Sequence, residues 1–283
     1  MLPEYKEPVV GFPTLMVIAS QPGVGKSSLM KGLNTKTKVK QYKCLHIDLQ
    51  GGSKHVGGYV LDVQAYAEKE KIGLPQALVR VIKQVKEENA KGEYLYDFVS
   101  IDPLTNMKPI VEALGTKLYN ESVIGKAAMK KLAEDKYGKA VSPDKYKEFA
   151  SKNVLNDIGQ NGWSFLQQAW GNLFTELRSL AGISTIFVAH TKYGTLKKGV
   201  MDEIQVKEIN FWPSLLLDLI GESTDSCVLY RKDNQVVASF KLEADQQHFK
   251  SRHFDGQEIV LSKKNPDGSI ETYWERIFPF LKD

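Results

Sequence analysis

The segment from Thr14 to Leu33 places a glycine-rich turn between an apolar, β-prone run and a helix-forming run. Thr14–Ala19 is the apolar run, and Ser28–Leu33 favours a first helix. The turn between them reads Ser20-Gln21-Pro22-Gly23-Val24-Gly25-Lys26-Ser27. A strand, a glycine-rich turn and a helix in this order are typical of a phosphate-binding loop. The sequence therefore predicts an α/β fold that binds a nucleoside triphosphate.

Each residue type in this turn suits a phosphate chain. Gly23 and Gly25 let backbone N–H groups curl inward around an anion. Lys26 can reach the β- and γ-phosphates, and the Ser27 hydroxyl suits Mg²⁺. Ser20 stands where the pattern G-x-x-x-x-G-K-[ST] has its first glycine. The alternative is a turn that contains Gly-Lys-Ser by chance. The expected nucleotide-binding residues are Gln21, Pro22, Gly23, Val24, Gly25, Lys26, Ser27 and Ser28.

Composition places the chain among soluble globular proteins. Of its 283 residues, 42% are hydrophobic and 25% are charged, which allows a substantial core. The net charge of +4 is too small to indicate nucleic-acid binding, so any basic surface must be local. Cys44 and Cys227 lie in apolar runs, which predicts buried free thiols in a reducing cytoplasm. We expect a cytoplasmic protein, because no signal-peptide pattern or run of ~18 apolar residues is evident.

The spacing of apolar residues predicts an open, mainly parallel sheet flanked by helices. Helical periodicity covers Leu74–Asn89 and Trp163–Ala181. Strands that alternate with helices wind into a parallel sheet, and strands buried on both faces are continuously apolar. The predicted parallel strands are Thr14–Ala19, Cys44–Leu49, Phe98–Ile101 and Ile183–Ala189.

The segment from about 103 to 160 has no strand signal. Short helices are expected at Pro109–Tyr119, Lys126–Tyr137 and Pro143–Lys152. Since a structureless loop of this length is unusual in a compact domain, we interpret it as a helical insertion on the rim of the nucleotide site, or a lid that orders on binding. A solvated decoration and a DNA-contacting arm remain alternatives.

Antiparallel strands are expected after Gly199. Two final segments, Arg252–Leu261 and Ile270–Trp274, suggest a hairpin, and Glu275–Leu281 a short terminal helix. We predict a core over 1–240, and a β-rich extension over 241–283 packed on it. The other expected strands are Ile204–Phe211, Ser226–Tyr230 and Gln235–Phe240, with a short helix at Leu215–Ile220.

Two predicted strands end in polar residues suited to the same site. Phe98-Val99-Ser100-Ile101-Asp102 has the form of a Walker B strand, whose carboxylate can hold Mg²⁺. His190 ends the strand Ile183–Ala189. If this strand lies between the Walker A and Walker B strands, His190 faces the γ-phosphate and can sense its loss. A strand-capping surface histidine is the alternative.

The run Lys192–Gly199 combines lysines, a tyrosine and glycines. We interpret it as a mobile loop that binds single-stranded DNA, because lysine neutralises phosphates and tyrosine offers a stacking face. A solvated surface loop is equally compatible. The candidate DNA-binding residues are Lys192, Tyr193, Lys197 and Lys198.

The water-activating group is the weakest part of the predicted site. A hydrolase of this class needs a carboxylate near the end of the second strand. Gln50 occupies that place; it can orient water but cannot accept its proton. Asp48, two residues earlier on the same side of the strand, or a group from a partner subunit could substitute.

The chain resembles RecA-type ATPases, and among them short phage AAA-domain proteins with a minimal RecA core that act in single-strand annealing and recombination. The similarity runs from about Leu15 to Tyr230. It is carried by the phosphate loop, Ile47-Asp48-Leu49-Gln50-Gly51-Gly52, Ile101-Asp102-Pro103-Leu104-Thr105, Gly162-Trp163 and Phe187-Val188-Ala189-His190-Thr191-Lys192. Ser20, Gln50, Pro103 and the insertion depart from the family pattern.

The resemblance implies ATP and Mg²⁺ as cofactors, with Lys26, Asp48, Gln50 and His190 as catalytic residues and Ser27 and Asp102 at the metal. It also implies a homo-oligomer around single-stranded DNA, a possible phage single-strand-binding partner, and the host cytoplasm if the protein is phage-encoded. Two alternatives remain. One is a nucleotide-gated assembly module that hydrolyses little ATP, and the other is a small-molecule P-loop kinase. The kinase ranks lower because the insertion has no arginine for a lid.

Overall fold

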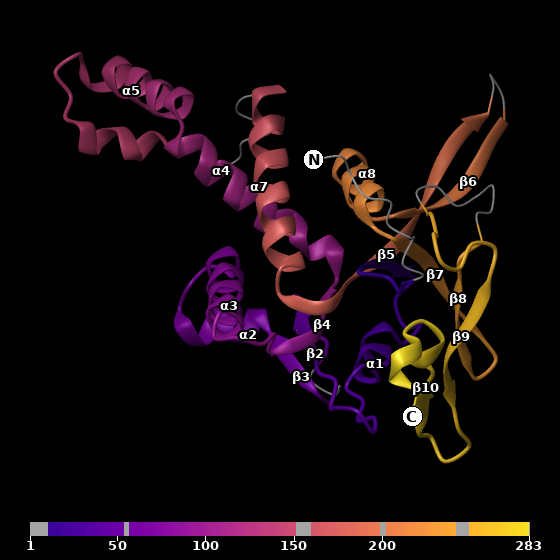
Figure 1. The fold of residues 1–283 in the computed structure, drawn as a ribbon. Helices are drawn as coiled ribbons and strands as arrows, with labels where there is room; N and C mark the ends of the chain where they lie inside the picture. Colours follow the sequence, from indigo (N-terminus) through magenta and orange to yellow (C-terminus); the bar gives the residue numbers. More distant parts are fainter. Residues whose placement is uncertain (1–10, 54–56, 151–159, 199–201, 242–248, 283) are drawn as a thin grey trace, which may run out of the picture.

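A computed structural model describes residues 11–53, 57–150, 160–198, 202–241 and 249–282. Within them, strands form a ten-stranded sheet in the order β10-β9-β8-β7-β1-β5-β4-β2-β3, and β6 pairs with β5 off this path (Figure 1). The parallel strands are β1 (Leu15–Ser20), β2 (Cys44–Asp48), β3 (Tyr59–Asp62), β4 (Tyr96–Asp102), β5 (Ala181–Lys198) and β7 (Asp225–Lys232).

The order of the parallel strands confirms the predicted fold class. Parallel pairing joins β1 to β5 and β7, β2 to β3 and β4, and β4 to β5. Strand β5 therefore lies between β1, which leads into the phosphate loop, and β4, which ends in Asp102. This meets the condition under which we expected His190 to face the phosphates, namely a position between the Walker A and Walker B strands. The edge strand β3 was missed, because it has only four residues and none of them is fully buried.

The sheet continues beyond β7 through antiparallel strands β8 (Gln235–Ser239), β9 (Glu258–Lys264) and β10 (Ile270–Thr272). The predicted start of β9 at Arg252 is wrong. The backbone N–H of Arg252 and the Ser251 hydroxyl instead donate to Asp225 Oδ1, which turns this stretch inward. The terminal helix is replaced by two 3₁₀ turns, η3 (Trp274–Arg276) and η4 (Pro279–Leu281).

Alternating side chains of the strands divide the interior into two cores. Leu15 and Val17 face a core formed with α2, α3, α4, α7 and α8. Met16 and Ile18 face the opposite core, formed with α1 and the C-terminal turns. The helices are α1 (Lys26–Lys31), α2 (Val63–Glu70), α3 (Leu74–Asn89), α4 (Met107–Glu121), α5 (Val123–Tyr137), α7 (Gln160–Arg178) and α8 (Pro213–Glu222).

The C-terminal strands pack directly behind the phosphate loop. Trp274 Nε1 donates to the Leu29 carbonyl of α1 at 2.8 Å. A Cβ at Gly32, just after α1, would lie 2.1 Å from Thr272 Oγ1 of β10, so this close approach requires glycine. The back of α1 is thus fixed by residues more than 200 positions later in the chain. The division at residue 240 stays a prediction.

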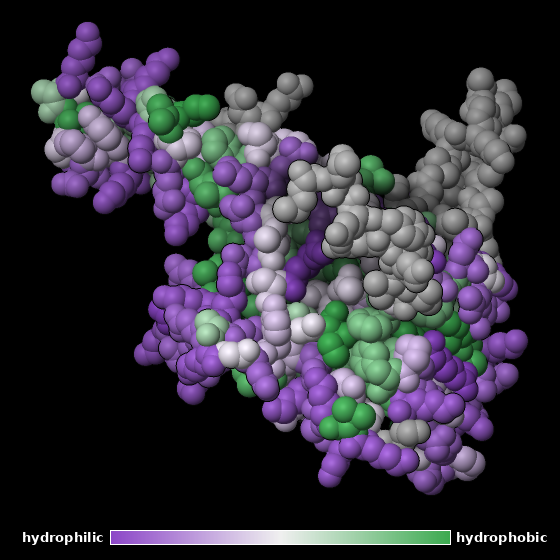
Figure 2. All heavy atoms as spheres, viewed as in Figure 1, coloured by the Kyte–Doolittle hydropathy of each residue, from purple (hydrophilic) through white to green (hydrophobic). Residues whose placement is uncertain are grey.

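The described part of the insertion is helical, as predicted. After the 3₁₀ turn η1 (Leu104–Asn106), α4 packs along α7. Helix α5 and the 3₁₀ segment η2 (Pro143–Phe149) contact each other and project from the body as an arm (Figure 1). Figure 2 shows mainly hydrophilic residues on this arm.

Both cysteines are free and buried, which confirms that prediction. Among the helices within the described ranges, none has the length and apolar character needed to cross a membrane.

Candidate functional site

The phosphate loop begins where β1 ends at Ser20. Gly23 and Gly25 adopt left-handed backbone angles, with φ of +82° and +108°, which side-chain-bearing residues rarely adopt. Helix α1 begins immediately afterwards at Lys26, and the Leu29 N–H donates to the Gly25 carbonyl at 3.0 Å. The predicted strand, turn and helix are therefore all present.

The ammonium group of Lys26 is held inside the loop. Its Nζ donates to Ser20 Oγ at 2.9 Å and to the Gln21 carbonyl at 3.1 Å, and it lies 3.3 Å from His190 Nδ1. Burial lowers the pKa of Lys26, while the charge of Asp102 acts in the opposite direction. Ser20 thus contributes a hydroxyl that positions the lysine, which explains how serine is accommodated in place of glycine.

Ser27 and Asp102 contact each other at the carboxyl end of β4. The Ser27 hydroxyl donates to Asp102 Oδ2 at 2.7 Å, and Asp102 lies in register with Asp48 on β2. Hydroxyl and carboxylate oxygens are the ligands that Mg²⁺ prefers. This donor pair therefore fits the magnesium ion that a nucleoside triphosphate carries.

These groups surround a pocket of about 440 Å³. The pocket brings together the expected loop residues from Pro22 to Ser28, except Val24, with residues of the other predicted strand ends. Gln21 does not line it. The lining residues are Pro22, Gly23, Gly25, Lys26, Ser27, Ser28, Asp48, Gln50, Gly52, Ser53, Asp102, Pro103 and His190. Of the described part of the insertion, only Pro103 contributes.

His190 lies beside the lysine at the end of the parallel part of β5, opposite Ser20 in register. Burial and the charge of Lys26 lower the pKa of His190, which favours the neutral imidazole. Its carbonyl accepts from the Asn210 N–H at 2.8 Å. His190 therefore contacts the phosphate loop through its side chain and the segment after β6 through its backbone.

Asp48 and Gln50 have different surroundings. Asp48 Oδ1 accepts from the N–H groups of Gln50 and Gly51, both at 2.9 Å, and Oδ2 accepts from Ser53 N–H at 2.6 Å. Both carboxylate oxygens thus hold the loop that follows β2. Gln50 is exposed and lines the pocket. The catalytic roles of these two residues stay predictions.

The run after His190 is not a loop, contrary to the sequence prediction. Thr191–Lys198 continues β5 and pairs antiparallel with β6 (Asp202–Ile209). Pairing with β6 holds this run in a strand conformation. The sequence of the run alone does not reveal that partner. Lys192 forms an ion pair with Glu208 at 3.4 Å. Tyr193 is 60% exposed, and its hydroxyl accepts from Gln21 Nε2 at 2.9 Å. The side chains of Lys197 and Lys198 lie outside the described structure.

Other cationic and aromatic residues near this hairpin were missed. Lys108 Nζ lies 5.9 Å from the ring centroid of Trp212 and donates to Asn210 Oδ1 at 3.4 Å. Burial, and repulsion from Lys192, lower the pKa of Lys108. Trp163 meets Trp212 edge to face at 6.5 Å. Lys108, Trp163 and Trp212 are far apart in the sequence and come together only in the fold, so no local sequence pattern indicates this cluster.

A smaller pocket of about 110 Å³ lies on the other side of the phosphate loop. It shares Gly25 and Ser28 with the larger pocket, and Val24 lines it. Arg231 Nη2 donates to the Val24 carbonyl at 3.4 Å. The two pockets together leave space on both sides of the loop, and Arg231 was not anticipated from the sequence.

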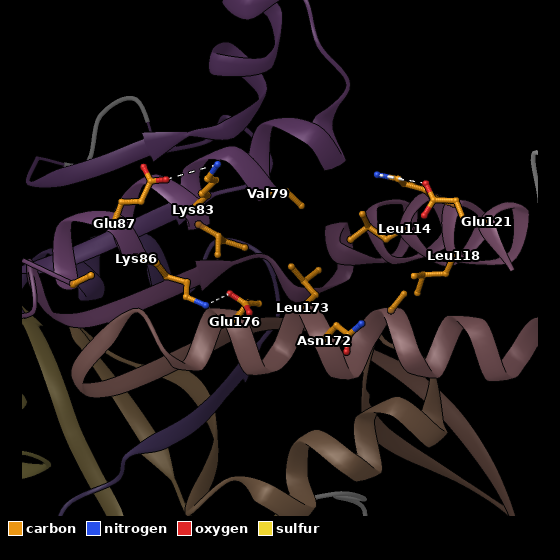
Figure 3. A pocket seen from close by; sticks show the side chains of 14 residues that line it. Val79, Lys83, Lys86, Glu87, Leu114, Leu118, Glu121, Asn172, Leu173 and Glu176 are labelled. Atoms are coloured by element: carbon orange, nitrogen blue, oxygen red, sulfur yellow. Dashed lines mark hydrogen bonds and ion pairs between the residues drawn. The ribbon is translucent and has the colours of Figure 1, made fainter.

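A third hollow of about 570 Å³ lies away from the phosphate loop, between α3, α4 and α7 (Figure 3). Its floor is apolar, with Leu114, Leu118 and Leu173. The charged side chains on its rim form ion pairs with each other: Lys83 with Glu87, Lys86 with Glu176, and Lys117 with Glu121. We assign it no catalytic role, because no nucleophile or unpaired acid lines it.

No protein-family model and no curated protein sequence matches the chain. Among solved structures, the RadB recombinase shares 13% identity over 93% of this chain and 92% of its own, with a TM-score of 0.37. A KaiC-like protein from Pyrococcus horikoshii shares 12% identity over 92% of this chain and 89% of its own, also with a TM-score of 0.37. The assignment of a RecA-like P-loop fold rests on the strand order and the site described above.

Proposed function

We propose that the protein is a Mg²⁺-dependent ATPase that acts on single-stranded DNA. Nucleotide binding is supported by one observation. Lys26, Ser27, Asp102 and His190 all line the pocket that the glycine-rich loop borders. Lys26 and Ser27 begin the helix that follows β1, Asp102 ends β4, and His190 lies on β5 between these two strands. Such convergence at the carboxyl ends of strands is the usual place for a ligand in an open α/β sheet.

Each group of residues would hold a different part of the nucleotide. Lys26 and the N–H groups around Gly23 and Gly25 would hold the phosphates, and the pocket beside Arg231 would take the nucleoside. Ser27 and Asp102 would hold Mg²⁺, which supplies positive charge against the phosphate oxygens. His190, 3.3 Å from Lys26 Nζ, would respond to the terminal phosphate and move the backbone of β5.

A nucleotide-gated assembly module is the second candidate. Asp48 is engaged by three N–H groups, and the exposed residue beside the pocket is the amide Gln50. An amide orients water without accepting its proton, so binding could be strong while turnover is slow. This candidate and the ATPase share the same binding site and differ in rate.

The DNA part of the proposal is supported by the cations and aromatic rings beside β5. Lys192 and Tyr193 are exposed, and Lys108 and Trp212 lie on the neighbouring elements. Lysine with an aromatic face suits single strands of any sequence. From the resemblance alone, we also propose a homo-oligomer around the strand, a phage single-strand-binding protein as partner, and the host cytoplasm as location.

Calorimetric titration with Mg²⁺ and ATP tests the nucleotide site. We expect saturable binding by the wild type and a loss of affinity of about 100-fold or more in Lys26→Ala, because the phosphates lose a charge-assisted hydrogen bond in a buried site. Lys31→Ala, an exposed lysine at the other end of α1, is the matched control and should bind normally. Equal affinities in Lys26→Ala and the wild type would refute the site assignment.

A further inference from the structure

His46 is a buried histidine that does not line the nucleotide pocket. It lies on β2, two residues before Asp48 and on the same side of that strand, and its side chain is 4% exposed. Nδ1 lies 2.8 Å from Ser100 Oγ, and Nε2 lies 2.9 Å from Ser53 Oγ. Each ring nitrogen therefore has a hydrogen-bond partner.

Ser53 is held at two points. Its N–H donates to Asp48 Oδ2 at 2.6 Å, and its hydroxyl meets His46 Nε2. The Gln50–Ser53 loop is thereby attached to β2 by two adjacent buried side chains. Since Gln50, Gly52 and Ser53 line the nucleotide pocket, this attachment fixes one wall of the pocket.

His46 also lies next to the predicted magnesium ligand. Nε2 is 3.8 Å from Asp102 Oδ2, the same oxygen that accepts from Ser27. The carboxylate favours a proton on Nε2, which then donates to Ser53 while Nδ1 accepts from the Ser100 hydroxyl. A continuous path of contacts therefore runs from Ser27 through Asp102 and His46 to Ser53.

We propose that His46 is a positioning residue that ties the Gln50–Ser53 loop to Asp102, so that occupation of the phosphate site sets the position of Gln50. The inference rests on the proposed ATP site and assigns it a regulatory connection. Outer groups that orient functional side chains commonly change activity by about 10- to 100-fold when removed. His46 touches no reacting atom, so its removal should lower turnover more than nucleotide affinity.

Three variants separate this role from simple packing. His46→Asn keeps a polar atom toward Ser100 but is too short to reach Ser53, and Ser53→Ala removes the same hydrogen bond from the other side. We expect each to lower kcat for ATP by about 10-fold with affinity for Mg²⁺-ATP nearly unchanged, and the double variant to lose no more than either alone. Ser100→Ala, which removes the bond on the opposite ring nitrogen, should keep kcat within about threefold.

Hydrogen exchange of a peptide covering residues 49–53, with and without Mg²⁺ and a non-hydrolysable ATP analogue, provides a readout that does not need turnover. We expect the analogue to increase amide protection in the wild type and Ser100→Ala, but not in His46→Asn or Ser53→Ala. A response that persists in His46→Asn and Ser53→Ala overturns the inference and leaves the ATP site intact. Equal losses in all three variants would mean packing alone and also overturn it. A wild type that binds the analogue in calorimetry but shows no added protection overturns the inference alone. A wild type that does not bind the analogue overturns the proposed function, and the inference with it.

Discussion

Ser20 and Gln50 both stand where the expected pattern has another residue, yet their surroundings give the two changes opposite consequences. The Ser20 hydroxyl accepts from Lys26 Nζ at 2.9 Å and donates to the Gln21 carbonyl at 2.8 Å, so serine adds a hydrogen bond to the loop. Gln50 is exposed at the pocket, and none of the described carboxylates that line this pocket, Asp48 and Asp102, is without a hydrogen-bond partner. Hydrogen bonds thus hold the residues that would bind phosphate and Mg²⁺, whereas the exposed side chain at the pocket is an amide that cannot accept a proton from water.

Replacing Gln50 with glutamate tests that dependence. We expect Gln50→Glu to raise kcat for ATP by about 10-fold or more, because a carboxylate can accept the proton of the attacking water. Gln50→Ala, which removes the amide that orients water, serves as the comparison and should be slower than the wild type. A fast wild type that Gln50→Glu does not improve would show that the amide does not limit turnover.

The sequence could predict those residues of the site that follow an apolar run directly or after the glycine turn. Asp102 and His190 end such runs, Lys26 and Ser27 follow the glycine turn, and the parallel strand order brings all four to one pocket. His46 and Ser53 carry no such signal, because a histidine inside a strand and a serine in a loop have many ordinary explanations. Their pairing depends on how the chain turns after Asp48, which only the folded structure defines.

At the scale of elements, continuous apolar runs were the dependable signal. Helix α3 has the predicted bounds, Leu74–Asn89, and β1, β2 and β4 lie within about two residues of theirs. Strand β6 was predicted at Ile204–Phe211, but its pairing with the outer half of β5 was missed, since Thr191–Lys198 is polar and glycine-containing. The strand conformation of that run comes from pairing with β6 over eight residue pairs, which the run itself does not reveal.

The exposed residues of this hairpin give a prediction for DNA. Lys192→Ala should weaken binding to single-stranded oligonucleotides and reduce the slope of log affinity against log salt by about 0.7, because one phosphate contact is lost. Fluorescence anisotropy at several salt concentrations measures both quantities. Lys263→Ala, an exposed lysine on β9, is the control that should leave the slope unchanged.

Tyr193 allows a separate test of stacking. Tyr193→Phe keeps the ring and removes the hydroxyl that accepts from Gln21, whereas Tyr193→Ala removes both. We expect the alanine variant to lose about 1–3 kcal/mol of single-strand affinity and the phenylalanine variant to lose little. Equal losses in the two variants would assign the effect to the hydrogen bond with the phosphate loop.

Asp225 anchors the segment between β8 and β9 to the start of β7. This fully buried carboxylate accepts from the N–H groups of Arg252 and His253, and lies 2.6 Å from His253 Nδ1. Asp225→Ala should lower the free energy of unfolding by about 3 kcal/mol, because these donors lose their partner. Urea denaturation measures the change, and the exposed Asp218→Ala should be nearly neutral. A small loss in Asp225→Ala would show that the segment is held by other contacts.

At the scale of the whole molecule, one sheet connects the phosphate loop to the C-terminal strands. The same core that contains Met16 and Leu29 contains Trp274 and Phe278. The sequence predicted a β-rich extension over 241–283 packed on the core, but local patterns do not show that β9 and β10 continue the sheet of β1. Contacts between residues about 245 positions apart, such as Trp274 with Leu29, are not visible in local patterns.

The two buried thiols report whether this continuous core unfolds as a unit. Burial raises the pKa of Cys44 to about 12, and also raises the pKa of Cys227, so neither thiol should react with a thiol reagent at pH 8 in the native state. In increasing guanidinium chloride, we expect both to become reactive at the midpoint of the circular dichroism transition. Two separate midpoints would indicate that the strands around Cys44 and those around Cys227 unfold independently.

Steady-state ATP turnover by the wild type, with and without single-stranded DNA, tests whether the protein is a DNA-dependent ATPase. We expect Mg²⁺-dependent turnover that DNA stimulates, since the backbone of β5 joins His190 at the phosphate site to Lys192 and Tyr193 on the hairpin. Turnover that is absent in both conditions, although Mg²⁺-ATP binds tightly, would contradict the ATPase proposal and leave the nucleotide-gated module. Turnover that DNA leaves unchanged would contradict the proposed connection between the phosphate site and the hairpin of β5 and β6.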